Sequence, residues 1–285
     1  NNHHDRINKL KILEKLKSSI ENIKVLFDQQ KFKSVIDECE NILLNNKSSL
    51  EALNFLGKAY LAQNDTSNSR LYFRKALSLS SNDYEILKNL GSTYQLEGDS
   101  LSAKKFYIKA LNINKNYAPA LSNLASIESA LGDNDKAEKL YEQAIKADKK
   151  LIAAWINLIN LHLTSNQIHK AEIRTNNAIL IFPNNFNLYF LHSKISFKKG
   201  NLNSVEESLK KTLNINHQFL PALLALGNLL KDKKQYEEAI TYAEKIIKLS
   251  PDDSSGYYLY GTVLILQDKL TEAEEKLRKS IQLNK

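Results

Sequence analysis

Apolar residues recur at helical spacing along residues 118–151, and the pattern predicts two amphipathic helices joined by a tight turn. Leu121 and Leu124 share one face of the first helix. The apolar face of the second helix is carried by Ala137, Leu140, Tyr141, Ala144 and Ile145. Gly132 suits the left-handed conformation that ends a helix, and Asp133 can cap the helix that follows. Such a hairpin cannot bury both of its faces alone, so we expect copies of it on either side.

The copies follow in steps of 34 residues. A small residue recurs in the first helix at position 8 of the repeat, as Gly57, Gly91, Ala125, Gly227 and Gly261. The step through Ala137, at position 20, finds Ala103, Ala171, Ala239 and Ala273. The step through Ile145 is aliphatic in all eight units, as Leu43, Leu77, Leu111, Ile145, Ile179, Leu213, Ile247 and Ile281. A register of this length without an insertion indicates a single repeat architecture.

A helix-turn-helix period of 34 with a small residue at position 8 and Ala at position 20 resembles the tetratricopeptide repeat (TPR) family. Trp155 at position 4, Tyr60 at position 11 and Pro183 at position 32 also match the family motif. The resemblance implies an all-α fold, a right-handed alpha-alpha superhelix or TPR solenoid of about eight helix-turn-helix repeats.

The register divides the chain into two parts. Residues 1–49 are expected to form an N-terminal helix and a degenerate first repeat. Seven TPR repeats are expected over residues 50–285, at 50–83, 84–117, 118–151, 152–185, 186–219, 220–253 and 254–285. The repeat that starts at Ile152 departs from the pattern, because Ile159 replaces the small residue and Thr175 the aromatic one. We expect such changes to spread the helices and to alter the local curvature.

The formal net charge of +8 and the pI near 9.2 suggest contacts with acidic partners. The chain has neither a Lys/Arg block nor a stacking-aromatic motif, so we expect no specific nucleic-acid partner. No apolar run is long enough to span a membrane, and a cytoplasmic location is the expectation. Cys39, the single cysteine, falls in a slot that is normally buried and is expected to be a core thiol.

Motifs for catalysis are missing from the sequence. It contains no Gly-rich phosphate loop, no nucleophile elbow and no His/Cys cluster with metal spacing. His162 and His192 occupy slots that the family uses for packing, so we expect them in the core. We therefore expect no enzyme activity, no catalytic residue, no cofactor and no metal site.

In the TPR family, first-helix residues line a concave inner groove. Asn89, Asn123 and Asn157 occupy position 6 of three successive repeats and resemble the asparagine ladder of the O-linked N-acetylglucosamine transferase superhelix. There, Asn amides hold the backbone of an extended peptide, since one amide offers both donors and an acceptor. The alternative is a role in helix packing. The carboxylate clamp of chaperone-binding TPRs is not present, because Ser92 follows Lys88 where the clamp has Asn.

The second half of the expected groove differs. Its first-helix positions carry Phe190, Lys194, Phe197, Asn228 and Lys231. Aromatic side chains beside lysines suit an apolar segment with acidic residues, through burial and charge complementarity. The alternative is that tight curvature already covers these side chains.

These observations favour a non-enzymatic scaffold that binds an extended peptide or a partner helix in the concave TPR groove. One alternative is the substrate-recruiting TPR arm of a larger enzyme such as a glycosyltransferase. Another is self-association through the C-terminal repeat, whose last helix at 270–283 has no capping helix after it.

Overall fold

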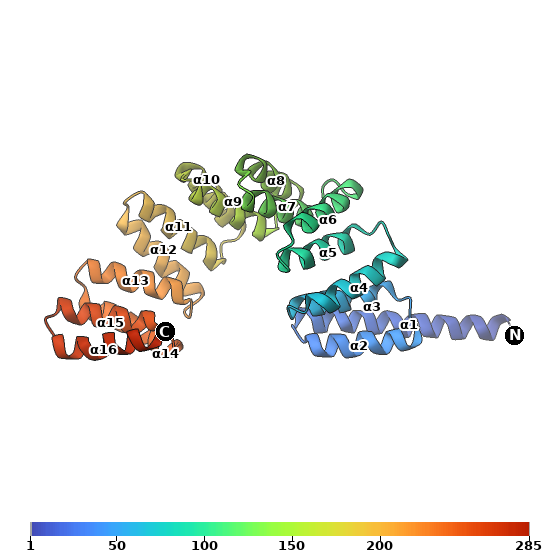
Figure 1. Ribbon diagram of the computed structural model, residues 1–285, viewed down its shortest axis with the longest axis horizontal. Helices are drawn as coiled ribbons and strands as arrows, with labels where there is room; N and C mark the ends of the chain where they lie inside the picture. Colours follow the sequence, from blue (N-terminus) through green and yellow to red (C-terminus); the bar gives the residue numbers. More distant parts are fainter. Residues whose placement is uncertain (1, 285) are drawn as a thin grey trace. The chain divides into compact units, whose positions relative to one another are not determined.

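The computed structural model describes the backbone of residues 2–284 and the side chains of residues 14–284. Over this range the chain forms sixteen α-helices and no strand (Figure 1), which confirms the all-α prediction. It divides into two compact units, Asn1–Leu151 and Ile152–Lys285. The predicted outer ends of the first and last domains, residues 1 and 285, lie outside the described residues.

The helices of the first unit are α1 (Asn2–Asp28), α2 (Phe32–Asn45), α3 (Leu50–Ala62), α4 (Thr66–Leu79), α5 (Tyr84–Leu96), α6 (Ser100–Ile113), α7 (Ala118–Ala130) and α8 (Asn134–Ala147). Those of the second are α9 (Ile152–Thr164), α10 (Ile168–Ile181), α11 (Phe186–Lys198), α12 (Leu202–Ile215), α13 (Leu220–Asp232), α14 (Tyr236–Leu249), α15 (Ser254–Leu266) and α16 (Leu270–Leu283). From α3 onward the first helix of a pair begins every 34 residues. The further division of each unit into separate domains of this length stays a prediction.

A left-handed residue turns the chain between the two helices of each pair. Positive φ angles from 56° to 88° recur at the same step of 34 residues, at Gln30, Asn64, Gly98, Gly132, Asn166, Gly200, Lys234 and Asp268. After Gly98, the Asp99 backbone N–H donates to the Tyr94 carbonyl oxygen at 2.9 Å. The Asp99 carboxylate then caps α6 by accepting from the Ser102 N–H at 3.0 Å. This is the stop-and-cap arrangement that the sequence predicts for these turns.

Small residues in the first helices make room for large ones in the second. Gly57 on α3 lies against the ring of Phe73 on α4, and Gly91 on α5 lies against Tyr107 on α6. Both rings are fully buried. The repeat that departs from the pattern exchanges these volumes, since Ile159 and Thr175 are also fully buried. The expected change in curvature stays a prediction.

First helices of successive pairs also contact one another. In the first unit α3 contacts α5 and α5 contacts α7; in the second, α9 contacts α11 and α13 contacts α15. We call the side chains that these helices leave available to a partner the first-helix face. In the first unit it comprises Asn54, Phe55, Lys58, Lys88, Asn89, Ser92 and Asn123. In the second unit it comprises Asn157, Phe190, Lys194, Phe197, Asn228, Lys231 and Tyr258.

Replacing Gly57 with Ala tests the close approach of α3 and α4. The added Cβ would lie 2.5 Å from Cε1 of Phe73, and overpacking should lower the free energy of unfolding by about 1–3 kcal/mol. Helix propensity alone predicts the opposite sign, a gain of roughly 1 kcal/mol. Urea unfolding decides the sign. A second exchange, Phe73→Leu, should recover part of the loss, and a stabilised single variant would contradict the close approach.

Replacing Lys234 with Gly tests the left-handed turn. Lys234 has a φ of 62°, and Gly should relieve about 1 kcal/mol of backbone strain, because only Gly adopts this conformation at no steric cost. The reciprocal variant is Gly98→Ala, where an added Cβ meets no atom within 4 Å. It should lose a similar amount through the backbone alone. Thermal unfolding of both variants measures the pair, and shifts of the same sign would refute the explanation.

Candidate functional site

Asn89 lies on α5 of the first unit and is buried, with 4% of its surface exposed. Its Nδ2 donates a hydrogen bond to Oδ1 of Asn54 on α3 at 3.3 Å. Its Oδ1 accepts a hydrogen bond from Nζ of Lys88 at 2.6 Å. Both ends of the predicted ladder amide are therefore engaged within the protein, and the side chain ties α3 to α5.

Asn123 is half-buried on the neighbouring first helix, α7. Its Nδ2 donates to Oγ of Ser92 at 3.2 Å and to the hydroxyl of Tyr107 at 3.3 Å. The Tyr107 hydroxyl donates in turn to Oε1 of Gln95 at 2.6 Å. The donors of Asn123 thus belong to a polar network between α5, α6 and α7. Its Oδ1 accepts no hydrogen bond from the described residues.

Asn157, the third predicted ladder residue, lies on α9 of the second unit. It is half-buried, and its amide makes no hydrogen bond with any other residue that the structure describes. Asn89 and Asn123 lie on helices that contact each other. The ladder as a binding site stays a prediction, and Asn157 is the member whose amide is uncommitted.

Two lysines of the first unit lie on the first-helix face. The Nζ of Lys58 lies 5.2 Å from the ring centroid of Phe55. Lys88 is half-buried, and burial, aided by the charge of Lys58 and opposed by Glu85, lowers its pKa to about 8. Neither lysine forms an ion pair with a described carboxylate. An incoming anion would restore part of the stabilisation that Lys88 loses when it leaves water.

The second unit carries an aromatic and basic cluster on α11. Phe190 is half-buried and packs edge-on against Phe219, with ring centroids 5.1 Å apart. The Nζ of Lys194 lies 4.7 Å from the centroid of the Phe190 ring. Phe197 is 66% exposed. The packing therefore covers Phe190 in part and leaves Phe197 open to a partner.

Asn228 and Lys231 lie on α13 and bond to each other. The Lys231 Nζ donates to Oδ1 of Asn228 at 3.1 Å, and Nδ2 of Asn228 donates to the Leu224 carbonyl at 3.0 Å. Lys231 also lies 3.9 Å from a carboxylate oxygen of Asp232. Of the predicted residues of the second unit, these two are the most engaged by the protein itself.

Sequence reasoning missed Asn54, Lys58 and Tyr258, the last of which is 58% exposed on α15. A signal for Lys58 was present. It follows Phe55 by three residues, as Lys194 follows Phe190 by four, and both spacings bring two side chains together on one helix face. Asn54 has no comparable signal, because its partner Asn89 lies a repeat away.

The expected core positions are confirmed. His162 is 1% exposed, and its Nδ1 lies 3.0 Å from Oε1 of Gln167. Cys39 is fully buried, and burial raises the pKa of its thiol to about 12. His192 is half-buried, with Nδ1 2.8 Å from the Ser208 hydroxyl.

Neither a metal site nor a membrane span is found in the part of the chain that the structure describes. No three His, Cys, Asp or Glu side chains there are grouped to hold a metal ion. No described helix combines the length and the apolar character needed to cross a bilayer.

Lys88→Met tests the desolvated lysine. Between the folded pKa of about 8 and the ordinary value of 10.5, the unfolded parent binds more protons than the folded one. The parent's stability therefore rises with pH across this window relative to the variant. After allowance for partial exposure, the difference should move by about 1–2 kcal/mol toward the parent.

The comparison cancels the constant cost of the lost hydrogen bond to Asn89, because that cost does not depend on pH. Urea unfolding at pH 7 and at pH 10.5 measures the change. Lys105→Met, at an exposed lysine on α6, is the control and should show no such movement. A Lys88→Met difference that is independent of pH would contradict the desolvation of Lys88.

Solved structures with the same fold are found in several proteins. A tetratricopeptide repeat protein from Parabacteroides merdae superposes with a TM-score of 0.60 at 18% identity, over 84% of this chain and 94% of that one. Yeast Tom70 gives a TM-score of 0.65 at 18% identity, over 88% of this chain and 55% of Tom70. A chain of the APC/C hetero-tetramer Cut9–Hcn1 gives 0.64 at 16% identity, over 92% and 52%. At these identities the likeness shows the fold alone.

One curated relative is the TPR repeat-containing protein PA4667 of Pseudomonas aeruginosa, 30% identical over 119 residues. The matched part is 41% of this chain and 20% of the relative, so the match spans about a fifth of that protein.

Family profiles described as tetratricopeptide repeat match residues 83–150, residues 50–83 and 220–253, and residues 128–195. The profiles cover most of the chain, and helix pairs recur at the family's 34-residue interval along it. The chain belongs to the tetratricopeptide repeat family.

Proposed function

We propose that this protein is a non-enzymatic scaffold whose first-helix face holds an acidic segment of a partner protein that also carries apolar side chains. The TPR fold supports a role in protein–protein interaction in general. One of its structural neighbours comes from the Cut9–Hcn1 hetero-tetramer, an assembly of different chains. The choice of an acidic, partly apolar segment rests on the side chains of this protein.

The observation that carries the proposal is the set of first-helix lysines without a carboxylate partner among the described residues. Lys58 and Lys88 of the first unit and Lys194 of the second belong to it. Lysines elsewhere are paired, as where Lys104 and Lys136 approach the buried Glu128 to 2.9 and 2.8 Å. Unpaired positive charge on one face favours an acidic partner, through complementary potential and faster encounter.

Exposed aromatic side chains supply the apolar part of the surface. Phe197 and Tyr258 are 66% and 58% exposed on first helices of the second unit. Aromatic residues are enriched in the buried centre of protein interfaces, where they contribute large contact areas. A partner that covers Phe197 would also bring its acidic groups within reach of Lys194, one helical turn away.

The asparagines have a smaller role in this proposal. The Oδ1 of Asn123 and the amide of Asn157 can bond to the backbone of the bound segment, as in the predicted ladder. Asn89 supports the face from within, because it orients Lys88. Asn228 does the same for Lys231.

A labelled peptide of alternating Phe and Asp residues tests the proposal by fluorescence polarisation. The same peptide with Lys in place of Asp is the control ligand. Lys194→Glu should weaken binding of the acidic peptide by about tenfold, roughly 1.4 kcal/mol, by reversing a charge beside the contact. Phe197→Ser should weaken it through lost burial, by roughly 1–2 kcal/mol.

Lys279→Glu is the matched control, because it reverses one exposed charge on the second helix α16. It should leave the affinity within about twofold, since only the long-range charge changes. Equal binding of the acidic and basic peptides, or equal losses for Lys194→Glu and Lys279→Glu, would overturn the proposal.

A further inference from the structure

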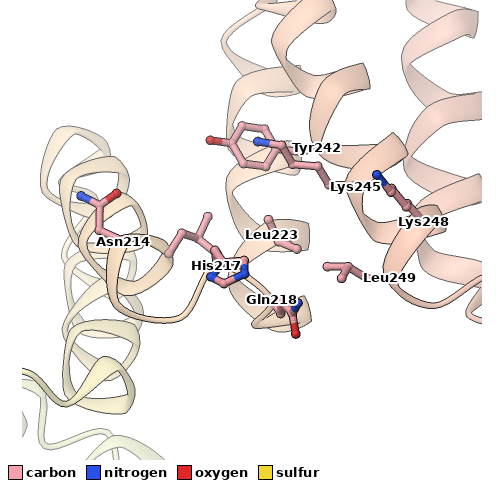
Figure 2. Close-up of a pocket in the computed structure, with 9 residues that line it drawn as sticks. Asn214, His217, Gln218, Leu223, Tyr242, Lys245, Lys248 and Leu249 are labelled. Atoms are coloured by element: carbon pink, nitrogen blue, oxygen red, sulfur yellow. The ribbon is translucent and has the colours of Figure 1, made fainter.

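A pocket of about 480 Å³ opens in the second unit, away from the residues of the first-helix face. It lies between the α12–α13 connection and α14 (Figure 2). His217 lines it from the connection, Leu223 from α13, and Tyr242, Lys245 and Lys248 from α14. Its volume lies in the range of about 300–1,000 Å³ typical of small-molecule sites.

The charge in this pocket is positive and unbalanced. Lys245 and Lys248 are three residues apart on α14, so their side chains share one side of the helix. Neither forms an ion pair with a carboxylate in the described chain, and no Asp or Glu lines the pocket. The Nζ of Lys245 lies 4.8 Å from the ring centroid of Tyr242, its aromatic neighbour in the wall. The pocket therefore offers two ammonium groups to an anion.

Apolar surface lies beside the two ammonium groups. Leu223 forms part of the wall and is 2% exposed, and Leu249 is 40% exposed at the edge. Leu213 and the ring of Tyr242 complete this surface. A small, fully hydrated anion such as phosphate would leave the apolar wall uncovered. An anion with an apolar body would cover the wall and meet the lysines at the same time.

The corresponding crevices of other repeats lack this combination. The crevice three repeats earlier, of about 490 Å³, is lined by Lys115 and Lys146 but by no aromatic or Leu side chain. In the crevice one repeat later, Glu275 lines the wall and pairs with Lys276 at 3.2 Å. The crevice itself is thus a product of the repeat geometry. The joining of unpaired lysines to an apolar wall belongs to one of these three sites.

We infer that the pocket between α12 and α14 binds an organic carboxylate with an apolar body, which the wall of Leu213, Leu223 and Tyr242 would cover while Lys245 and Lys248 hold the carboxylate. The same chemistry is offered by a free aliphatic or aromatic acid and by the C-terminal carboxylate of a peptide that ends in a bulky apolar residue. This site is independent of the proposed first-helix surface, because the two have no residue in common.

Octanoate titrated into the isotope-labelled protein and followed by NMR tests the inference. The backbone amide signals of His217 and α14 should shift in a saturable way. Octanamide, which keeps the chain and loses the charge, should bind about tenfold more weakly, and so should inorganic phosphate. Acetyl-Gly-Leu-Phe with a free carboxylate, compared with its amide, identifies the second source. Binding by one source alone assigns the ligand to that source and supports the inference.

Lys245→Met and Lys248→Met should each lower octanoate affinity by about five- to tenfold. Lys146→Met is the matched control, since Lys146 occupies the position of Lys248 three repeats earlier, and it should leave the affinity unchanged. Leu249→Ser reports on the apolar wall and should weaken octanoate more than phosphate. Octanamide or phosphate bound as tightly as octanoate, an equal loss in Lys146→Met, or the absence of any saturable shift would overturn the inference.

Discussion

The close approach of the two helices in each pair is the constraint on which the rest of the structure depends. Phe73 and Tyr107 are buried because Gly57 and Gly91 carry no side chain opposite them. A single pair has no other core, so its remaining apolar side chains need the pairs before and after it. The core is therefore built along one dimension. The side chains of the first-helix face are left free to serve a partner, because packing within the pair does not require them.

The fold could be predicted from the sequence because its determinants are local and periodic. A left-handed residue such as Gly132 and a capping residue such as Asp133 act over a few residues, and they recur at a fixed step. The candidate site could be predicted only in part. Asn89 was identified by its position, but its hydrogen bonds depend on Asn54 a repeat away and on the burial of Lys88. Such contacts depend on how successive pairs pack, which the pattern of one repeat does not contain.

Charge is distributed unevenly between the helices of the described chain. On second helices, carboxylates are matched closely, as where Glu206 binds both Lys210 and Lys233. The lysines that remain without such partners include Lys88 and Lys194 on first helices and Lys245 beside the pocket. The positive net charge of the protein is thus concentrated at sites where apolar surface is also at hand. This coincidence gives both proposed sites a preference for partners that combine acidic and apolar groups.

The turns of the first unit have a consequence for the order in which it folds. The pairs α5–α6 and α7–α8 have Gly at the left-handed position and an Asp cap after it, whereas the turn between α1 and α2 has Gln30 and no side-chain cap. Hairpins with strain-free turns form fastest, and in a repeat protein a formed hairpin is the template on which its neighbours assemble. We infer that folding of this unit begins around residues 84–147 and spreads toward α1. Amide hydrogens in α1 and α2 would then exchange with solvent earlier than those in α5–α8.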